Sequence, residues 1–373
     1  KAGLTEITIP ATVESIGSSA FSGASKGKGT LVKVTFAKDK DGNCALTSIG
    51  SNAFRFQNIV SIVIPKSVTT IGNYAFATNL DLTSFTFESG TKITTFGTYI
   101  FSTCEKLPTF TVPKSVTTLG NYSFESCTAL KEVIFEEGSK LTATGTYTFK
   151  GSGIVSIVFP DSLKIVGTTK ATAPSASSSG NLFYSCESLT SVTFGKNVTH
   201  INGKTFYNCT ALTKVNIPDT VTQIGVSTFE GCTSLKSVEF GENSKLTTLG
   251  ASVFKASGIE SISLPANVTL LGTGSKTVSA TTNSSIFSGC VNLKSVEFKG
   301  DVAKIGASAF EGCVALTEIK LPESVTLIGK NCFKGCTALA KIDLGNNPAL
   351  TNIGAYAFAN TAIESFTVPS GVT

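Results

Sequence analysis

The sequence repeats one unit, at a nearly constant interval, along its whole length. Within residues 305–336 the pattern I-G-x-x-A-F-x-G-C-x-A-L-x-x-I-x-L-P occurs and then begins again, so that Phe310 and Phe333 are 23 residues apart. Self-similarity with a period of roughly 20 to 50 residues is the signature of a solenoid, in which each repeat packs against its neighbours. We therefore expect the chain to fold as one quasi-linear body with a continuous core.

The aromatic residue of a G-x-x-x-F segment anchors each unit. There are 14 anchors, mostly 22 to 25 residues apart, with three longer gaps of 33, 34 and 33 residues. They are Phe21, Phe54, Phe76, Phe101, Phe124, Phe149, Phe183, Phe206, Phe229, Phe254, Phe287, Phe310, Phe333 and Phe358. Insertions lie near residues 22–30, 37–45, 168–181 and 273–285, and the last two are rich in Ser, Thr, Ala and Gly, which is typical of exposed segments. The prediction is a single solenoid domain, residues 1–373, of about 14 repeats of 22–25 residues.

A segment of the form L-x-x-V-x-F, in which apolar and polar residues alternate, recurs along the chain. Residues 130–135 and 235–240 are examples. This alternation, with frequent β-branched residues, predicts a short strand with one buried face. Fifteen such strands are counted, from residues 4–9 to residues 363–368. We expect them to pair in parallel, because each runs in the same direction through its unit.

The segment V-T-x-I-G follows each strand, and its β-branched residues predict a second, shorter strand. Gly ends this segment in 13 of 14 units, from Gly17 to Gly354, and Asn202 is the exception. Asn is the residue other than Gly that best tolerates positive φ, so we expect the chain to bend with positive φ at this position. The four residues that follow, ending at the anchor Phe, suit a single helical turn.

Eight of the ten cysteines share one repeat position, three residues after the anchor Phe. They are Cys104, Cys127, Cys186, Cys209, Cys232, Cys290, Cys313 and Cys336. Other units carry Ala, Gln, Asn, Ser or Thr there, which favours a buried thiol. Parallel Cβ vectors in neighbouring repeats do not suit a disulfide, and zinc requires clustered Cys and His, whereas the chain has one His. We expect ladders of packed Phe and of reduced, buried thiols, with no metal and no cofactor.

The charge composition argues against a nucleic-acid partner. Charged residues make up 15% of the chain, the formal net charge is +5, and Arg55 is the single Arg. Nucleic-acid binders usually cluster Lys and Arg on one face and use Arg to read or stack on bases. No apolar run has the length of about 18 residues that a membrane span requires. The ends at Lys1 and Thr373, the latter part-way through a unit, are interpreted as processing boundaries.

The unit resembles the BspA-type, or Treponema pallidum-type, leucine-rich repeat, L-x-x-V-x-I-P-x-x-V-x-x-I-G-x-x-A-F-x-x-C, over the whole chain. Departures are Asn202, the units without Cys and the insertions. The resemblance implies a leucine-rich-repeat solenoid, repeat α/β or mainly β. A parallel sheet of about fifteen short strands would form one face, with short second strands and single helical turns on the other. It also implies a secreted or cell-surface protein of bacteria or protist parasites, whose partner would be a host or microbial surface protein or glycan.

In such a solenoid the residue types at outward strand positions differ from repeat to repeat. The fifth strand position is Thr or apolar early in the chain and becomes charged late, as at Glu239, Glu297, Lys320 and Asp343. An apolar patch is expected on neighbouring strands, because contiguous exposed apolar side chains often mark contact sites. The predicted ligand-binding residues are Ile134, Val155, Ser156, Val158, Ser191 and Thr193. The alternative is that β-branched residues there simply suit parallel strands.

Catalytic readings find little support in the sequence. His200 is the one His, and no G-x-S-x-G motif accompanies it. Residues 39–43, D-K-D-G-N, resemble part of a calcium loop, but Gly50 stands where the loop's final Glu would be. We expect no enzyme but a surface protein that mediates adhesion or binds a protein or glycan through its strand face. The alternative is a structural spacer or stalk, for which outward positions would be uniformly polar; a hydrolase is a distant third.

Overall fold

The computed structural model describes residues 3–168, 180–268, 270–271, 283–345, 349–365 and 367–372. Most of the insertions at 168–181 and 273–285, together with Gly272, lies outside the described residues. Contacts divide the chain into two units, the first Lys1–Ala171 with Leu182–Val192 and the second Thr172–Asn181 with Thr193–Thr373. Each unit is described by itself, and a single domain over the whole chain stays a prediction.

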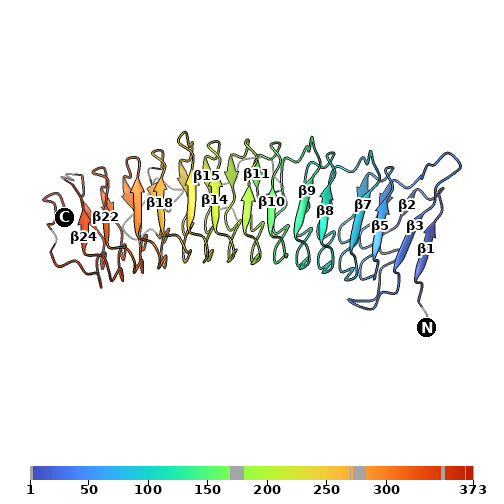
Figure 1. Cartoon of the computed structure of the whole chain (residues 1–373), viewed down its shortest axis with the longest axis horizontal. Helices are drawn as coiled ribbons and strands as arrows, with labels where there is room; N and C mark the ends of the chain where they lie inside the picture. Colours follow the sequence, from blue (N-terminus) through green and yellow to red (C-terminus); the bar gives the residue numbers. More distant parts are fainter. Residues whose placement is uncertain are drawn as a thin grey trace. The chain divides into compact units, whose positions relative to one another are not determined.

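In the first unit the longer strands follow one another in chain order and pair in parallel within two four-stranded sheets (Figure 1). They are β1 (Glu6–Ile9), β3 (Lys33–Phe36), β5 (Ser61–Ile64), β7 (Ser84–Phe87), β8 (Thr109–Val112), β9 (Glu132–Phe135), β10 (Ser156–Val158) and β12 (Ser191–Thr193). Two-residue strands form a second row: β2 (Ser15–Ile16), β4 (Ser48–Ile49), β6 (Thr70–Ile71) and β11 (Ile165–Val166).

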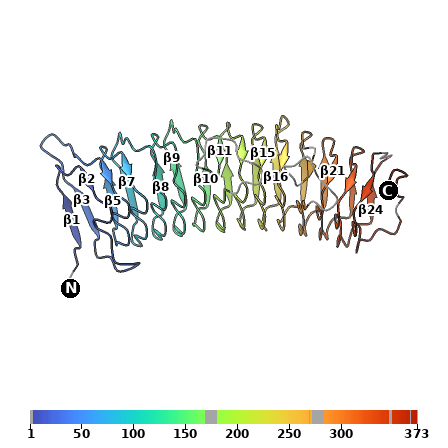
Figure 2. The same ribbon diagram turned by 180° about the vertical axis from the view of Figure 1, so that it is seen from behind.

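The second unit repeats this arrangement, as Figure 2 shows from behind. Its longer strands are β14 (Lys214–Ile217), β16 (Ser237–Phe240), β18 (Ser261–Leu264), β20 (Ser295–Phe298), β22 (Glu318–Lys320) and β24 (Lys341–Asp343). Its two-residue strands are β13 (His200–Ile201), β15 (Gln223–Ile224), β17 (Thr248–Leu249), β19 (Leu270–Leu271), β21 (Lys304–Ile305), β23 (Leu327–Ile328) and β25 (Asn352–Ile353). The predicted mainly β solenoid of parallel strands, with a short second strand in most turns, is confirmed.

Two details of the strand prediction are wrong. Within the described residues no helix forms, and each Gly-to-Phe segment is a turn whose third residue has positive φ, for example Ser19 at 58° and Asn52 at 55°. A left-handed residue interrupts the run of right-handed residues that a helical turn needs. The described residues 363–365 and 367–368, where the fifteenth strand is predicted, form no strand. Val368 is 53% exposed, so the segment gains little burial by joining the sheet.

The repeated glycine is required for a reason other than the predicted one. Among the described repeated glycines Gly167 alone has positive φ, at 87°, and Asn202 is not left-handed, so the expected bend at this position is wrong. A Cβ on Gly97 would instead lie 2.5 Å from the carbonyl oxygen of Gly72, in the turn before. At Gly17, on the first turn, a Cβ would meet nothing within 4 Å. The position is therefore one where the backbones of successive turns touch.

The anchor phenylalanines form the predicted ladder through the core of each unit. Consecutive rings stack with centroids 5.1 to 6.3 Å apart. Apart from the half-buried Phe21 and Phe358 they are fully buried. This continuous stack removes a large apolar area from water in every turn.

The cysteine row is buried as predicted, and its thiols are free. The structure adds a reason for the residue type. Seven of the eight thiols donate to the carbonyl oxygen of the preceding anchor, as Cys104 Sγ does to Phe76 O at 3.3 Å and Cys232 Sγ to Phe206 O at 3.0 Å. Where Cys is replaced, Asn79 Nδ2 donates to Phe54 O at 2.8 Å and Gln57 Nε2 to Phe21 O at 2.6 Å. The position therefore supplies a donor to a buried carbonyl group.

Replacing Phe229 by Ala should destabilise the protein by about 3 to 5 kcal/mol, the usual cost of deleting a buried Phe side chain. Phe229 is fully buried and stacks on Phe206 and Phe254, with ring centroids 5.3 and 5.7 Å away. Because repeats contact only their neighbours, the loss should appear in calorimetry as a split melting transition. The control is Phe21→Ala, at a half-buried anchor, which should cost clearly less. Equal melting curves for the two variants would contradict the ladder.

The free energy of unfolding should fall as the pH rises above about 9. Burial raises the pKa of the Cys104, Cys186 and Cys232 thiols from 9.0 to about 12. Between these values the unfolded chain loses thiol protons that the folded chain keeps, which favours unfolding by about 1.4 kcal/mol per pH unit and thiol. Urea denaturation near pH 7 and near pH 10 measures the slope.

A Cys104→Ser, Cys232→Ser variant is the control for that slope, because Ser152 and Ser257 occupy this position in other turns. It should lose less stability with rising pH than the unsubstituted chain. Identical slopes would show that the alkaline loss comes from Lys and Tyr instead.

Candidate binding surface

The strand face of the first unit presents a row of exposed side chains with two apolar patches. Val63 on β5 is 55% exposed, Ile134 on β9 is 44% exposed and Val158 on β10 is 65% exposed. The register pairs Ile157 with Val133, which brings Val158 beside Ile134. The patch of Val63 and its neighbour Val60 was not predicted, although the same alternation marks it.

The other predicted ligand-binding residues are placed differently. Ser156 is half-buried beside Glu132, and Ser191 on β12 is exposed. Thr193 is exposed but belongs to the second unit, so it is not described relative to the others. The expectation that Val155 is in solvent is wrong. Its side chain is half-buried, whereas Val60, at the same repeat position, is 45% exposed.

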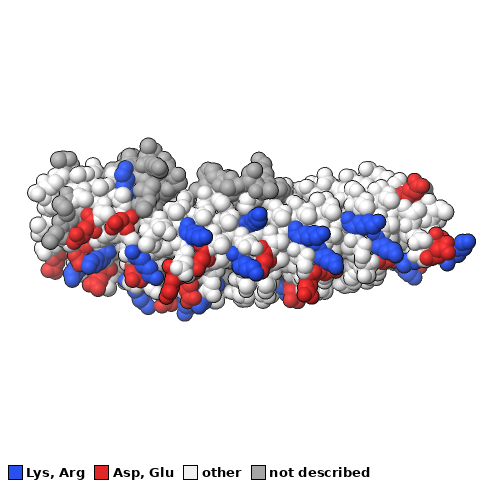
Figure 3. Space-filling model, turned by 90° about the horizontal axis from the view of Figure 1, so that it is seen from above, with Lys and Arg blue, Asp and Glu red and all other residues white. Residues whose placement is uncertain are grey.

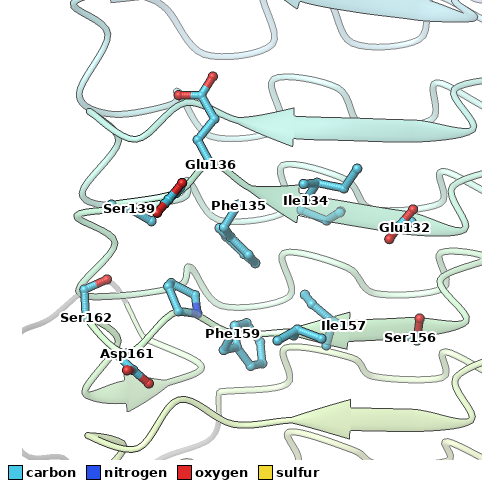
Figure 4. Close-up of a pocket in the computed structure, with 15 residues that line it drawn as sticks. Glu132, Ile134, Phe135, Glu136, Ser139, Ser156, Ile157, Phe159, Asp161 and Ser162 are labelled. Atoms are coloured by element: carbon cyan, nitrogen blue, oxygen red, sulfur yellow. The ribbon is translucent and has the colours of Figure 1, made fainter.

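Ile134 and Val158 border a hollow of about 470 Å³ between β9 and β10 (Figure 4). Its floor includes Phe135, which is half-buried, and Phe159, which is buried, with ring centroids 6.1 Å apart. The apolar strip follows from the alternation in each strand, since Ile134 and Val158 point outward while their neighbours turn in. We call this site the β9–β10 hollow.

Carboxylates lie at both ends of the β9–β10 hollow. Glu132 is at the start of β9, and Glu136, Glu137 and Asp161 come from the turns after β9 and β10, at the other end (Figure 4). The backbone N–H of Lys114 donates to Glu136 Oε2 at 2.8 Å, which orients that carboxylate. None of the 15 lining residues, all described, is Lys or Arg. The hollow therefore combines an apolar centre with a negative rim.

Other hollows on the strand faces carry lysine. The one beside Val63 includes Lys33 with Glu88, and one in the second unit includes Lys299 and Lys320 with acidic residues. Charges of the two signs alternate over the face shown in Figure 3, without a block of one sign. Many form surface ion pairs, such as Lys214 Nζ with Glu239 Oε1 at 2.6 Å. The β9–β10 hollow differs from these hollows in having no positive side chain in its lining.

Sequence reasoning missed the rim of this hollow. Glu136, Glu137 and Asp161 are not among the predicted ligand-binding residues. A usable signal exists, because an E-E-G turn after β9 and a P-D-S turn after β10 stand at the same end of paired strands. Parallel neighbours place their carboxyl-end turns at one edge of a sheet.

His200 and Asp39, which were considered above for catalysis and metal binding, make local contacts that support the fold. His200 is half-buried, burial lowers its pKa, and its Nδ1 lies 2.9 Å from Thr199 Oγ1. Asp39 Oδ1 accepts the backbone N–H groups of Asp41 and Asn43 at 2.9 and 2.8 Å, so this side chain closes its own turn. In the part of the chain that the structure describes, no group of three or more potential metal ligands comes together. Nor does any helix there have the length and apolarity to cross a membrane.

Comparison with known proteins finds one family. The model of the BspA type leucine rich repeat region matches residues 1–38, 47–171, 177–277 and 275–373. A leucine-rich repeat protein from Bacteroides ovatus is similar, with 28% identity and a TM-score of 0.55, covering 86% of this chain and 79% of that one. A leucine rich cell surface protein from Faecalibacterium prausnitzii shows 22% identity and a TM-score of 0.45, covering 91% and 88%. A search of curated proteins finds no match.

Proposed function

Because the chain belongs to the BspA-type leucine-rich repeat family, we propose that it is a non-catalytic bacterial protein, secreted or held at the cell surface. It binds a protein or glycan through the strand face of its first unit and so mediates adhesion. The observation that carries this proposal is the β9–β10 hollow, where Ile134 and Val158 are 44% and 65% exposed.

Exposure of these two side chains costs free energy that a partner recovers. A fully buried Val or Ile side chain contributes about 1.5 to 3 kcal/mol relative to an exposed one. The strand scaffold holds both side chains in fixed places, so a partner loses little by ordering them. Rigid, exposed apolar anchors with a polar rim have the character of interaction hot spots.

The spacer alternative predicts outward positions that are uniformly polar. Thr86 and Thr111 fit that description on β7 and β8, but Val63, Ile134 and Val158 do not. Apolar residues at outward positions add nothing to the core and reduce solubility, so a stalk has no use for them. This difference favours binding over a purely structural role.

Replacing Ile134 and Val158 together by Lys should weaken binding of the partner by about 2 kcal/mol, roughly 30-fold, if each contributes about 1 kcal/mol. Val155 is left unchanged in this variant because its side chain is half-buried. Screening the purified protein on an array of extracellular-matrix proteins and glycans identifies a ligand, and titration then gives the affinities. The melting temperature should stay the same, because both side chains are in solvent.

Thr86→Lys is the matched control, since Thr86 occupies the same strand position on β7, is exposed and lies outside the hollow. It should leave the affinity unchanged. An array ligand that binds both variants as tightly as the unsubstituted protein would place the binding site elsewhere. Failure of every array ligand to bind would favour the spacer.

A further inference from the structure

We infer that the β9–β10 hollow binds an extended segment of a partner protein in which one apolar side chain lies between two basic side chains. This inference rests on the proposed function and specifies the chemistry of its partner. It follows from three properties of the hollow: an apolar centre, carboxylates at both ends, and no Lys or Arg among its described lining residues.

The distance between the charges fits an extended peptide. Glu132 and Glu136 lie four residues apart along β9, which corresponds to about 13 Å at roughly 3.3 Å per residue. In an extended peptide, residues i, i+2 and i+4 project from the same face with the same spacing. A sequence of the form basic-x-apolar-x-basic therefore places one cation at each end of the hollow and the apolar side chain over Ile134 and Val158.

The negative rim selects for charge as well as shape. The Lys114 N–H group fixes the Glu136 carboxylate on the β8 side of the acidic end of the hollow. Four carboxylates line the hollow, from Glu132, Glu136, Glu137 and Asp161. They repel nucleic acids and acidic glycans, and they attract Lys or Arg side chains.

Two other occupants fit less well. A metal ion would need carboxylates gathered around one point, whereas Glu132 and Glu136 lie at opposite ends. A neutral sugar would need an exposed aromatic face to stack on, whereas Phe159 is 3% exposed. The exposed apolar surface belongs to the aliphatic Ile134 and Val158, which suit an apolar side chain.

Fluorescence anisotropy with labelled peptides and the whole chain tests the inference. The probe is Gly-Lys-Gly-Phe-Gly-Lys-Gly, and the comparison peptides replace both Lys by Glu or the Phe by Ser. The probe should bind at least tenfold more tightly than either comparison peptide. Raising the salt concentration from about 0.05 M to about 0.5 M should weaken its binding several-fold, because the charges are partly exposed.

Charge-reversing and charge-neutralising variants locate the site. Glu132→Gln with Glu136→Gln should reduce probe binding at least tenfold, and Glu132→Lys with Glu136→Lys should transfer the preference to the Glu-containing peptide. The matched control is Glu6→Gln, because Glu6 occupies on β1 the position that Glu132 has on β9. It should bind the probe like the unsubstituted chain. Thermal melts confirm that each variant is folded.

The outcomes separate this inference from the proposed function. If the probe binds no better than the Glu peptide, or if the Gln variant binds it normally, the partner chemistry is wrong. In that case an array ligand whose affinity still depends on Ile134 and Val158, a glycan included, leaves the strand-face function standing. If substitutions in the hollow change the affinity for neither the peptide nor any array ligand, both proposals are wrong.

Discussion

Backbone hydrogen bonds from each turn to the next set the spacing on which every other contact depends. Phe54 N donates to Ala75 O, and Phe229 N to Val253 O, each at 2.8 Å. Hydrogen-bonded strands lie about 4.8 Å apart, a separation close to that of two stacked aromatic rings. The same register between successive turns therefore aligns the Phe rings, the thiol donors and the glycines at which backbones touch. A residue at any position meets its counterparts in the turns on either side.

The periodicity made much of this predictable. Alternation predicted the longer strands and the outward direction of Ile134 and Val158, and the spacing of Phe predicted the ladder. The role of the glycine was missed because sequence spacing does not tell which backbone atoms approach one another. Gly97 touches Gly72, 25 residues earlier, and no local pattern reports that contact. The donor role of Cys was likewise hidden, since its acceptor lies one turn away.

The binding surface was predictable in its centre and not at its rim. The alternation along β9 predicts which face of the sheet Ile134 occupies. It makes no prediction for side chains beyond the end of the strand. Glu136 and Asp161 belong to turns, whose side-chain directions depend on the path of the chain after the strand. Val155 shows the converse limit, because the pattern predicts an outward direction and the structure leaves the side chain half-buried, whereas Val60 at the same repeat position is 45% exposed. The same repeat position is therefore exposed to different degrees in different turns.

For the exported protein that we propose, the row of reduced thiols has a consequence in an oxidising exterior. In the folded chain the row is shielded from oxidants, and burial raises the pKa of Cys104 and Cys232, which keeps them in the less reactive thiol form. A turn that opens exposes its sulfur, and nearby sulfurs in other open turns then form disulfides that the native arrangement does not contain. Such bonds prevent the turns from closing again in register. Resistance to local opening is thus also chemical protection, and the lifetime of the molecule outside a cell depends on how rarely its turns separate.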